Sequence, residues 1–465
     1  MATIASSTVE HGTANSVALD PRKYQAINDL LGATDFNKPD VRDLLVQTYG
    51  DQGITGFLSL TGAVNSGGSA DQVEWFEEGR RHKLYKATTG GSVSSGALTS
   101  TLVFEENPQK YDVLMHTASG KKYIVSGTSA DPDTITGGTV DIAELAASTN
   151  QTITDDDEFV YLGNMYPQGS DQPDFFFETT PVRRKNPYMI VKDRYEVNGS
   201  QATNIGYVNV GNGDYRWFMH GEQEARKRFM DRREMMLLFG DQLSSAADGA
   251  FSDNKDKVEG SQGYFSAVDT RGIEVTGVGS DPLDSFTEFD LILTELDRQG
   301  APSEYAMYLN RKQSLAIDDM LAAGVATQLT AGLPGQFGAF NNSADMAVQL
   351  GFKSFTRGGY TFHKHDWKLL NDPTLVGAVT SGGVAGAMIP MSNVADARTG
   401  VKAPALELCY KEANGYSREM EHWVTGGGVL GHNNNGDNGK DTATFHYRSE
   451  VALVTRAANQ HVLLK

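Results

Sequence analysis

The sequence "GDYRWFMHGEQEARKRFMDRREMMLLFGDQ", residues 213–242, predicts one long helix in a chain otherwise made of short strands and turns. Asp214 is a residue type that caps helix N-termini, and Gly240 is one that ends helices. The helix should run over about residues 217–239. At about 1.5 Å per residue it would form a rod roughly 35 Å long, so it should organise the domain that contains it.

Apolar residues recur along this helix at spacings that place them on one side. Phe218, Ala225, Phe229 and Met236 follow each other at intervals of seven, four and seven residues. The stretch "EMMLLFG" is apolar nearly all round and should be buried. We therefore expect the helix to pack on a sheet through these four residues.

The charges of the helix are nearly balanced. Six basic and five acidic residues lie between Asp214 and Glu234, which favours a face paired with neighbours over a phosphate-binding stripe. Glutamates stand four residues before arginines, a favourable order for helical ion pairs. A solvated amphipathic helix is the alternative interpretation. The candidate inter-subunit charge pairs involve Glu222, Arg226, Glu224, Arg228 and Arg232.

Composition excludes several classes of protein. The chain has 465 residues, 59 acidic against 40 basic, and a net charge of −19, so it should repel nucleic acid on average. Its one cysteine, Cys409, rules out an intrachain disulfide or a cysteine-rich metal site. No apolar run is long enough for a membrane span, and the N-terminus does not resemble a secretory signal.

The rest of the chain predicts an α+β protein. Residues from about 99 to 170 contain short β-branched and aromatic runs separated by turn residues, which predicts a small β-module. Residues 281–325 are helical in pattern, and the part after 401 is again β-like. Fifty glycines fit a structure with many turns.

The motifs that could carry chemistry are weak. "HKHDW" places His363 and His365 on one side of a strand, with Asp366 next, which is a possible metal-ligand spacing. No third imidazole or carboxylate precedes the pair, so exposed or interface histidines are the favoured interpretation. "GGGVLG" at 426–431 is followed by a loop and not by the helix that a dinucleotide site needs. We expect no cofactor and no enzymatic activity.

Three segments, in this order, resemble a known family. They are "NPYMIVKDRYEVNGSQA" at 186–202, "RREMMLLFG" with the following "QGYF" around the end of the long helix, and "FHYRSEVALVTRAANQHVLL" at 445–464. Together they resemble the major capsid proteins of tailed bacteriophages with the Hong Kong 97-type fold, in the form with a β-module inserted in the extended loop. The resemblance covers roughly residues 70–270 and 400–465, and 281–400 only in outline.

The resemblance implies a domain layout. The long helix would be the spine helix of a peripheral domain, and the chain would leave that domain and return to it. The implied parts are an N-terminal arm at 1–70, an extended loop at 71–180 with its β-module at about 99–170, a peripheral domain at 181–270 and 401–465, and an axial domain at 271–400.

The resemblance also implies a function. The chain would assemble with itself into hexamers and pentamers of an icosahedral phage head that encloses double-stranded DNA without reading its sequence. Scaffolding, portal and decoration proteins would be partners. Scaffolding should be a separate protein, because the arm begins at Met1 without a long helical domain. The location would be the virion capsid, after assembly in the host cytoplasm, with no membrane involved.

Two alternatives remain open. The first is a β-rich virion decoration or surface-binding protein, in which the 99–170 module binds a partner. The second is a metal hydrolase that uses His363, His365 and Asp366.

Overall fold

The computed structural model describes residues 64–80, 82, 84–94, 97–98, 102–129, 138–146, 150–172, 181–203, 217–243, 260–278, 281–330, 354–374, 383–391, 393–395, 402–426 and 440–465. These residues form two compact units. The first contains the described residues within 192–232 and 421–448, and the second contains the others. Residues 1–63 of the predicted N-terminal arm (residues 1–70) lie outside the described residues.

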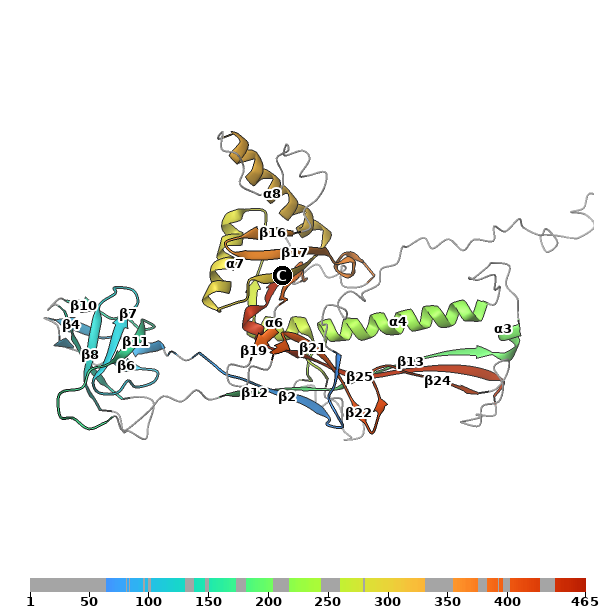
Figure 1. The fold of residues 1–465 in the computed structure, drawn as a ribbon, viewed down its shortest axis with the longest axis horizontal. Helices are drawn as coiled ribbons and strands as arrows, with labels where there is room; N and C mark the ends of the chain where they lie inside the picture. Colours follow the sequence, from blue (N-terminus) through green and yellow to red (C-terminus); the bar gives the residue numbers. More distant parts are fainter. Residues whose placement is uncertain are drawn as a thin grey trace, which may run out of the picture. The chain divides into compact units, whose positions relative to one another are not determined.

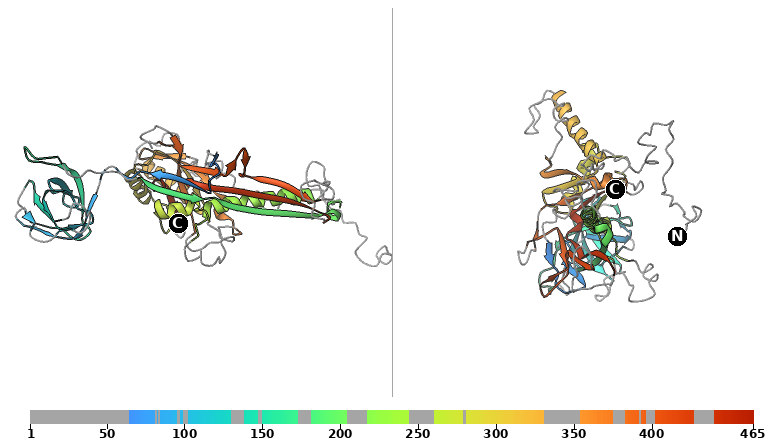
Figure 2. Two further views of the ribbon diagram at one scale, coloured as in Figure 1. Left: turned by 90° about the horizontal axis from the view of Figure 1, so that it is seen from below. Right: turned by 90° about the vertical axis from the view of Figure 1, so that its right-hand side faces the viewer.

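A long helix on a sheet makes up the first unit. Helix α4 (Trp217–Phe239) spans the range predicted from the sequence, and α3 (Gly199–Thr203) precedes it. Figures 1 and 2 show α4 running alongside the strands β13 (Met189–Asn198), β24 (Glu421–Gly426) and β25 (Thr442–Thr455). Strand β24 pairs antiparallel with the first half of β25. Helix α4, β13 and β25 all continue into the second unit.

The same sheet continues in the second unit. Strand β21 (Leu406–Tyr410) pairs antiparallel with the second half of β25 and parallel with β1 (Val64–Ser66). Its core joins the end of α4 with α6 (Tyr264–Arg271). Gly240 follows the last residue of α4, and only glycine fits there, because a Cβ at this position would come within 2.4 Å of the Met236 carbonyl oxygen.

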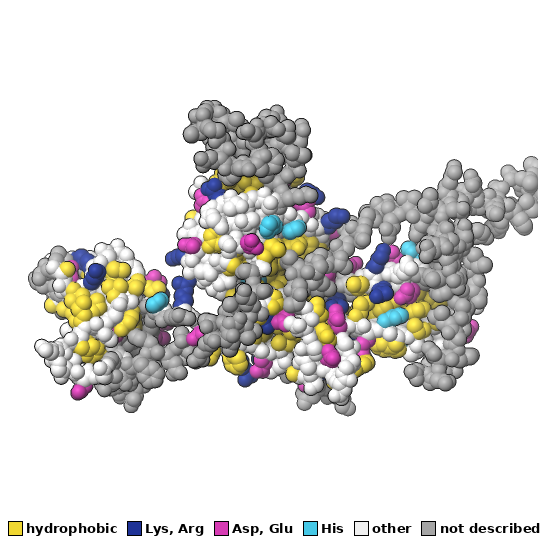
Figure 3. All heavy atoms as spheres, in the orientation of Figure 1, with side chains coloured by type: hydrophobic (Ala, Val, Ile, Leu, Met, Phe, Trp, Pro, Cys, Tyr) yellow, Lys and Arg dark blue, Asp and Glu magenta, His cyan; other side chains and the backbone are white. Residues whose placement is uncertain are grey.

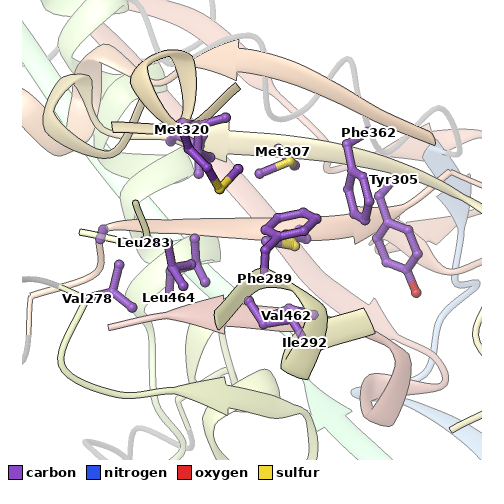
Figure 4. Close-up of a cluster of buried hydrophobic side chains, with 14 of the residues drawn as sticks. Val278, Leu283, Phe289, Ile292, Tyr305, Met307, Met320, Phe362, Val462 and Leu464 are labelled. Carbon is purple, nitrogen blue, oxygen red and sulfur yellow. The ribbon is translucent and has the colours of Figure 1, made fainter. Parts of the chain in front are cut away.

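A second, six-stranded sheet carries two helices, α7 (Phe286–Arg298) and α8 (Arg311–Thr330). Both helices contribute to one core on the sheet (Figure 4), in which Phe289 of α7 and Met320 of α8 are buried. The strands in spatial order are β14 (Ile273–Val275), β26 (Val462–Leu464), β18 (Gly386–Pro390), β15 (Glu304–Leu309), β17 (Tyr360–Asp366) and β16 (Ser354–Arg357).

Nine short strands form the β-module. The sheet curls back on itself, because Val103 bridges to Thr139 beside β9. It includes three strands before residue 99, so the module starts earlier than the sequence suggested. In chain order the strands are β3 (Leu84–Thr89), β4 (Ser92–Ser94), β5 (Ala97–Leu98), β6 (Val103–Phe104), β7 (Asp112–His116), β8 (Lys122–Thr128), β9 (Val140–Glu144), β10 (Gln151–Thr152) and β11 (Glu158–Asn164).

The chain enters and leaves the module through a two-stranded antiparallel ribbon. It consists of β2 (Gln72–Glu77) and β12 (Val182–Pro187), paired over six residues. The remaining short elements are β19 (Asn393–Ala395) with β20 (Lys402–Pro404), β22 (Glu412–Ala413) with β23 (Tyr416–Ser417), and the 3-10 turns η2 (Lys368–Asn371) and η4 (Ala458–Gln460).

Candidate interaction surfaces

The first half of α4 packs as the apolar spacing predicts. Ala225 and Phe229 are buried. The Phe229 ring stacks on Tyr447 of β25, with 5.7 Å between the ring centroids. The side chain of Phe218 lies outside the described residues. These contacts hold this part of the helix on the sheet.

The second half of α4 turns a different side inward. Leu237 and Leu238 are buried in the core that contains Tyr264, whereas Met236 is 45% exposed. The prediction that Met236 continues the buried stripe is therefore wrong. The cause is that α4 passes from one unit into the other near residue 232, and the second core lies against another side of the helix.

Acidic residues of α4 interact within the chain. The Tyr447 hydroxyl donates a hydrogen bond to the Glu222 carboxylate at 2.6 Å, and His422 Nε2 lies 4.0 Å from the same carboxylate. Burial, with the Glu222 carboxylate, raises the pKa of Tyr447 well above its usual value. The predicted pair of Glu222 with Arg226 is not formed among the described residues; the Glu222 carboxylate instead accepts the hydrogen bond of Tyr447.

Arg232 is also paired inside the chain. It donates a hydrogen bond to Asp193 of β13 at 2.8 Å, so it does not stand free for a neighbouring subunit. Within the part of the chain that the structure describes, Glu224 and Arg228 form no ion pair with each other. The exposed basic residues of α4 that make no ion pair among the described residues are Arg226, Lys227 and Arg228.

The ribbon has one face turned toward its own chain and one turned away. Trp75 of β2 is 8% exposed and packs with Tyr188 and Cys409, while the adjacent Phe76 is 66% exposed. Gly67 permits this packing, because a Cβ there would lie 1.6 Å from the Tyr188 hydroxyl. The ribbon therefore leaves a large aromatic side chain uncovered by the described residues.

Glu77 fastens the base of the ribbon. Its carboxylate accepts hydrogen bonds from the Trp75 indole at 3.1 Å and from the Ala457 backbone N–H at 3.2 Å. Arg184 of β12 lies 3.4 Å away and Arg271 of α6 lies 3.6 Å away. The two guanidinium groups bracket a half-buried carboxylate, which ties both strands to α6 and to the C-terminal segment.

The two helices on the six-stranded sheet also leave apolar residues outside. Leu291 of α7 is 69% exposed and Leu315 of α8 is 53% exposed. Helix α7 is held on the sheet from the other side, where Arg357 donates two hydrogen bonds of 2.6 Å to Asp290. Because α7 and α8 are packed on the sheet, these leucines are apolar side chains on the surface of a folded domain, where a partner could cover them.

The structure does not bring the histidine pair into a metal site. The His365 ring stacks on Tyr308, and Asp366 pairs with Arg311 at 2.7 Å. The described residues contain no group of three or more His, Cys, Asp or Glu side chains that could hold a metal ion. His363 is half-buried on the same strand.

The β-module contains two buried polar side chains that no sequence motif singles out. Asp112 is 3% exposed and accepts a hydrogen bond from the Gln109 backbone N–H. Burial raises the pKa of Asp112 to about 6. His116 is also buried, and it lies 2.8 Å from Ser119 and 3.2 Å from Asp157. Only the position of Asp112 at the start of the apolar run Val113–Met115 could have suggested this burial.

Hydrophobic side chains also gather on the surface of the module (Figure 3). The exposed large ones in this part of the chain are Leu84, Leu145, Leu162 and Met165. In the described part of the chain, no helix combines the length and the apolar character needed to cross a membrane.

Comparisons with known proteins give structural similarity only. No protein-family model matches the sequence, and no curated protein matches it. The chain is similar to a solved structure from Gordonia phage Cozz, with TM-score 0.41, 11% identity, and coverage of 97% of this chain and 99% of that chain.

Two further similar structures are capsids. One is the capsid structure of the cyanophage P-SCSP1u, with TM-score 0.39, 9% identity, and coverage of 97% of this chain and 98% of that one. The other is the capsid of a native GTA particle, with TM-score 0.36, 10% identity, and coverage of 94% and 97%. All three TM-scores are below 0.5, so the function has to be inferred from the chain's own features.

Proposed function

We propose that this chain is a major capsid protein with the Hong Kong 97-type fold, which assembles into hexamers and pentamers of an icosahedral phage head around double-stranded DNA. Its task is structural, not catalytic. It would act in the virion capsid, after assembly in the host cytoplasm with scaffolding and portal proteins and with decoration proteins on the finished shell. The order of the three quoted sequence segments supports the family.

The ribbon is the observation that carries this proposal. Trp75 and Glu77 fasten one face of β2 to the body of the chain, while Phe76 on the other face is 66% exposed. A large aromatic side chain on a fixed strand is costly to leave in water and is typical of a contact surface. A second copy of the chain would cover it.

Several such surfaces on one subunit favour a closed assembly. The exposed apolar residues of the ribbon, α7 and α8 lie on different elements of the second unit. Contacts between unlike surfaces of identical subunits generate rings when the rotation between subunits closes, and such rings are the units from which we propose the shell is built. The decoration or surface-binding protein remains the alternative, and it would need only one such surface.

Electron microscopy of the purified protein, expressed with its scaffolding protein, tests the proposal. We expect closed shells from the natural sequence. The variant Phe76→Ser should stay folded and soluble but fail to close shells, and Leu162→Ser, in an exposed position of the β-module, is the matched control. A small oligomer of defined size that never closes would overturn the proposal in favour of the alternative.

A further inference from the structure

The charges of α4 are sorted by side. The described helix has five basic and four acidic residues, which is nearly balanced. Four of the five basic residues are exposed, whereas none of the four acidic residues is. The near-neutral composition therefore hides a basic outer surface, which the sequence count could not reveal.

Packing explains the sorting. Glu222 is turned toward the sheet, where it accepts the hydrogen bond of Tyr447. Glu234 is 1% exposed, and Glu224 and Asp231 are half-buried. At about 100° per residue, Arg226, Arg228 and Arg232 stand on the flanks of the helix, about 60–100° from the buried Phe229, and Lys227 stands on its outer side. The acidic side chains are thus less exposed than the basic ones, so Arg226, Lys227 and Arg228 dominate the exposed charge of the helix that is not paired within the described chain.

The surplus of positive charge extends over the described surface of the first unit. Seven exposed side chains there are basic and two are acidic, in a chain whose net charge is −19. A cluster of exposed basic side chains on an acidic protein is a feature that a polyanion can bind. The basic residues are Lys192, Arg194, Arg226, Lys227, Arg228, Arg232 and Lys440, and the acidic ones are Glu196 and Asp441.

We propose that Arg226, Lys227 and Arg228 contact phosphate groups along the backbone of the nucleic acid that the shell encloses. This inference rests on the proposed function. The three residues are consecutive on a helix, so they are spread over about 200° of its circumference. The long Arg and Lys side chains can bend from the flanks of the helix toward a duplex that lies along its outer side. Duplex DNA offers a phosphate charge about every 1.7 Å along its axis, so several phosphates lie within reach of each of the three side chains.

Such a contact is independent of base sequence. Lys binds a phosphate as a point charge, and Arg binds it through two parallel N–H groups. Among the described residues, this face carries no row of amide side chains suited to reading base edges. A second copy is the less favoured occupant, because Lys192 and Arg194 make the sheet side of the same unit basic as well.

The test measures how binding to DNA depends on salt. A fluorescent 30-base-pair duplex (a length of about 100 Å at the spacing of B-DNA) is titrated with unassembled full-length protein at several salt concentrations. The variant replaces all three residues: Arg226→Gln, Lys227→Gln and Arg228→Gln. Glutamine keeps the helix propensity, and none of these side chains is buried. The matched control replaces three exposed lysines outside the first unit, Lys110→Gln, Lys122→Gln and Lys185→Gln.

If each of the three residues meets one phosphate, the slope of log K against log salt should fall by about 2.7 in the variant. The control should change it by less than about 1. Shells should still form from the variant in electron micrographs. An unchanged slope, or no DNA binding by the natural sequence, would overturn the inference.

Loss of shells with an unchanged slope would also overturn it, and would assign this face to contacts between copies. Failure of the natural sequence to form shells would instead count against the proposed function, whatever the DNA titration shows. The two proposals therefore fail in different measurements.

Discussion

The β-module and the ribbon that carries it differ in how they are stabilised. The module buries a core of its own, with rings such as Phe104, Tyr123 and Phe159 inside a curled sheet. The ribbon has only two strands, and Trp75 is the one apolar side chain of β2 that is buried. An isolated two-stranded ribbon is marginally stable in water. The module should therefore fold by itself, whereas the ribbon should depend on contacts with the body and with other subunits.

The same difference appears in what each part leaves exposed. Phe76 lies on a strand whose other face is fastened by Trp75 and Glu77. The module also exposes apolar residues, but they are Leu and Met side chains, and its largest aromatic side chains are inside. The exposed ring of Phe76 is larger than these side chains, so the ribbon is the stronger candidate for a contact that assembly completes.

Removing a core ring should give the largest effect on the module. Phe159 is fully buried between Phe104 and His116, so Phe159→Ala should lower the free energy of unfolding of the module by about 3–5 kcal/mol. Calorimetry of the full-length protein, with limited proteolysis to map the unfolding segment, measures it. Leu162→Ala on the same strand is the matched control, with an expected cost below about 0.5 kcal/mol. One transition that shifts as a whole would contradict the independence of the module.

A smaller effect should come from the buried carboxyl group of the module. Burial raises the pKa of Asp112 to about 6, against roughly 3.9 in an unfolded chain. Ionising it costs the folded state more than the unfolded state. The module should therefore be most stable below about pH 4, lose about 2–3 kcal/mol as the pH rises to about 6, and keep that loss above pH 6.

The variant Asp112→Asn removes this titration and keeps an oxygen that can accept the Gln109 N–H. Its melting temperature should exceed that of the natural sequence at pH 7.5 and match it near pH 4. Asp141→Asn, in an exposed position of the module, is the control. Equal melting temperatures at both pH values would remove Asp112 as the cause.

Local patterns predicted the parts of the fold that depend on local order. The spacing of Ala225 and Phe229 located the buried side of the first half of α4. Short β-branched runs located most strands of the module. The short strands β4 and β5 were not predicted, because "TTGGSVSSGALTS" at 88–100 is rich in glycine, serine and threonine and lacks a clear alternation.

Features of the structure that depend on tertiary contacts could not be predicted from local sequence patterns. Nothing in the sequence shows that α4 changes cores near residue 232, so Met236 was misplaced. Helical spacing pairs Glu222 with Arg226, but Tyr447, more than two hundred residues away, holds the carboxylate. Glu77, which fastens the ribbon, has partners on three separate segments, and no local pattern indicates them.

Hydroxyl-radical footprinting of unassembled subunits and of purified shells tests most directly whether neighbours cover the ribbon. Phe76 is 66% exposed in the subunit, and Met165 of the module, 56% exposed, serves as the internal reference. Oxidation of Phe76 relative to Met165 should fall severalfold in shells. Equal relative oxidation of Phe76 in both states would show that assembly leaves the ribbon uncovered and would contradict the account.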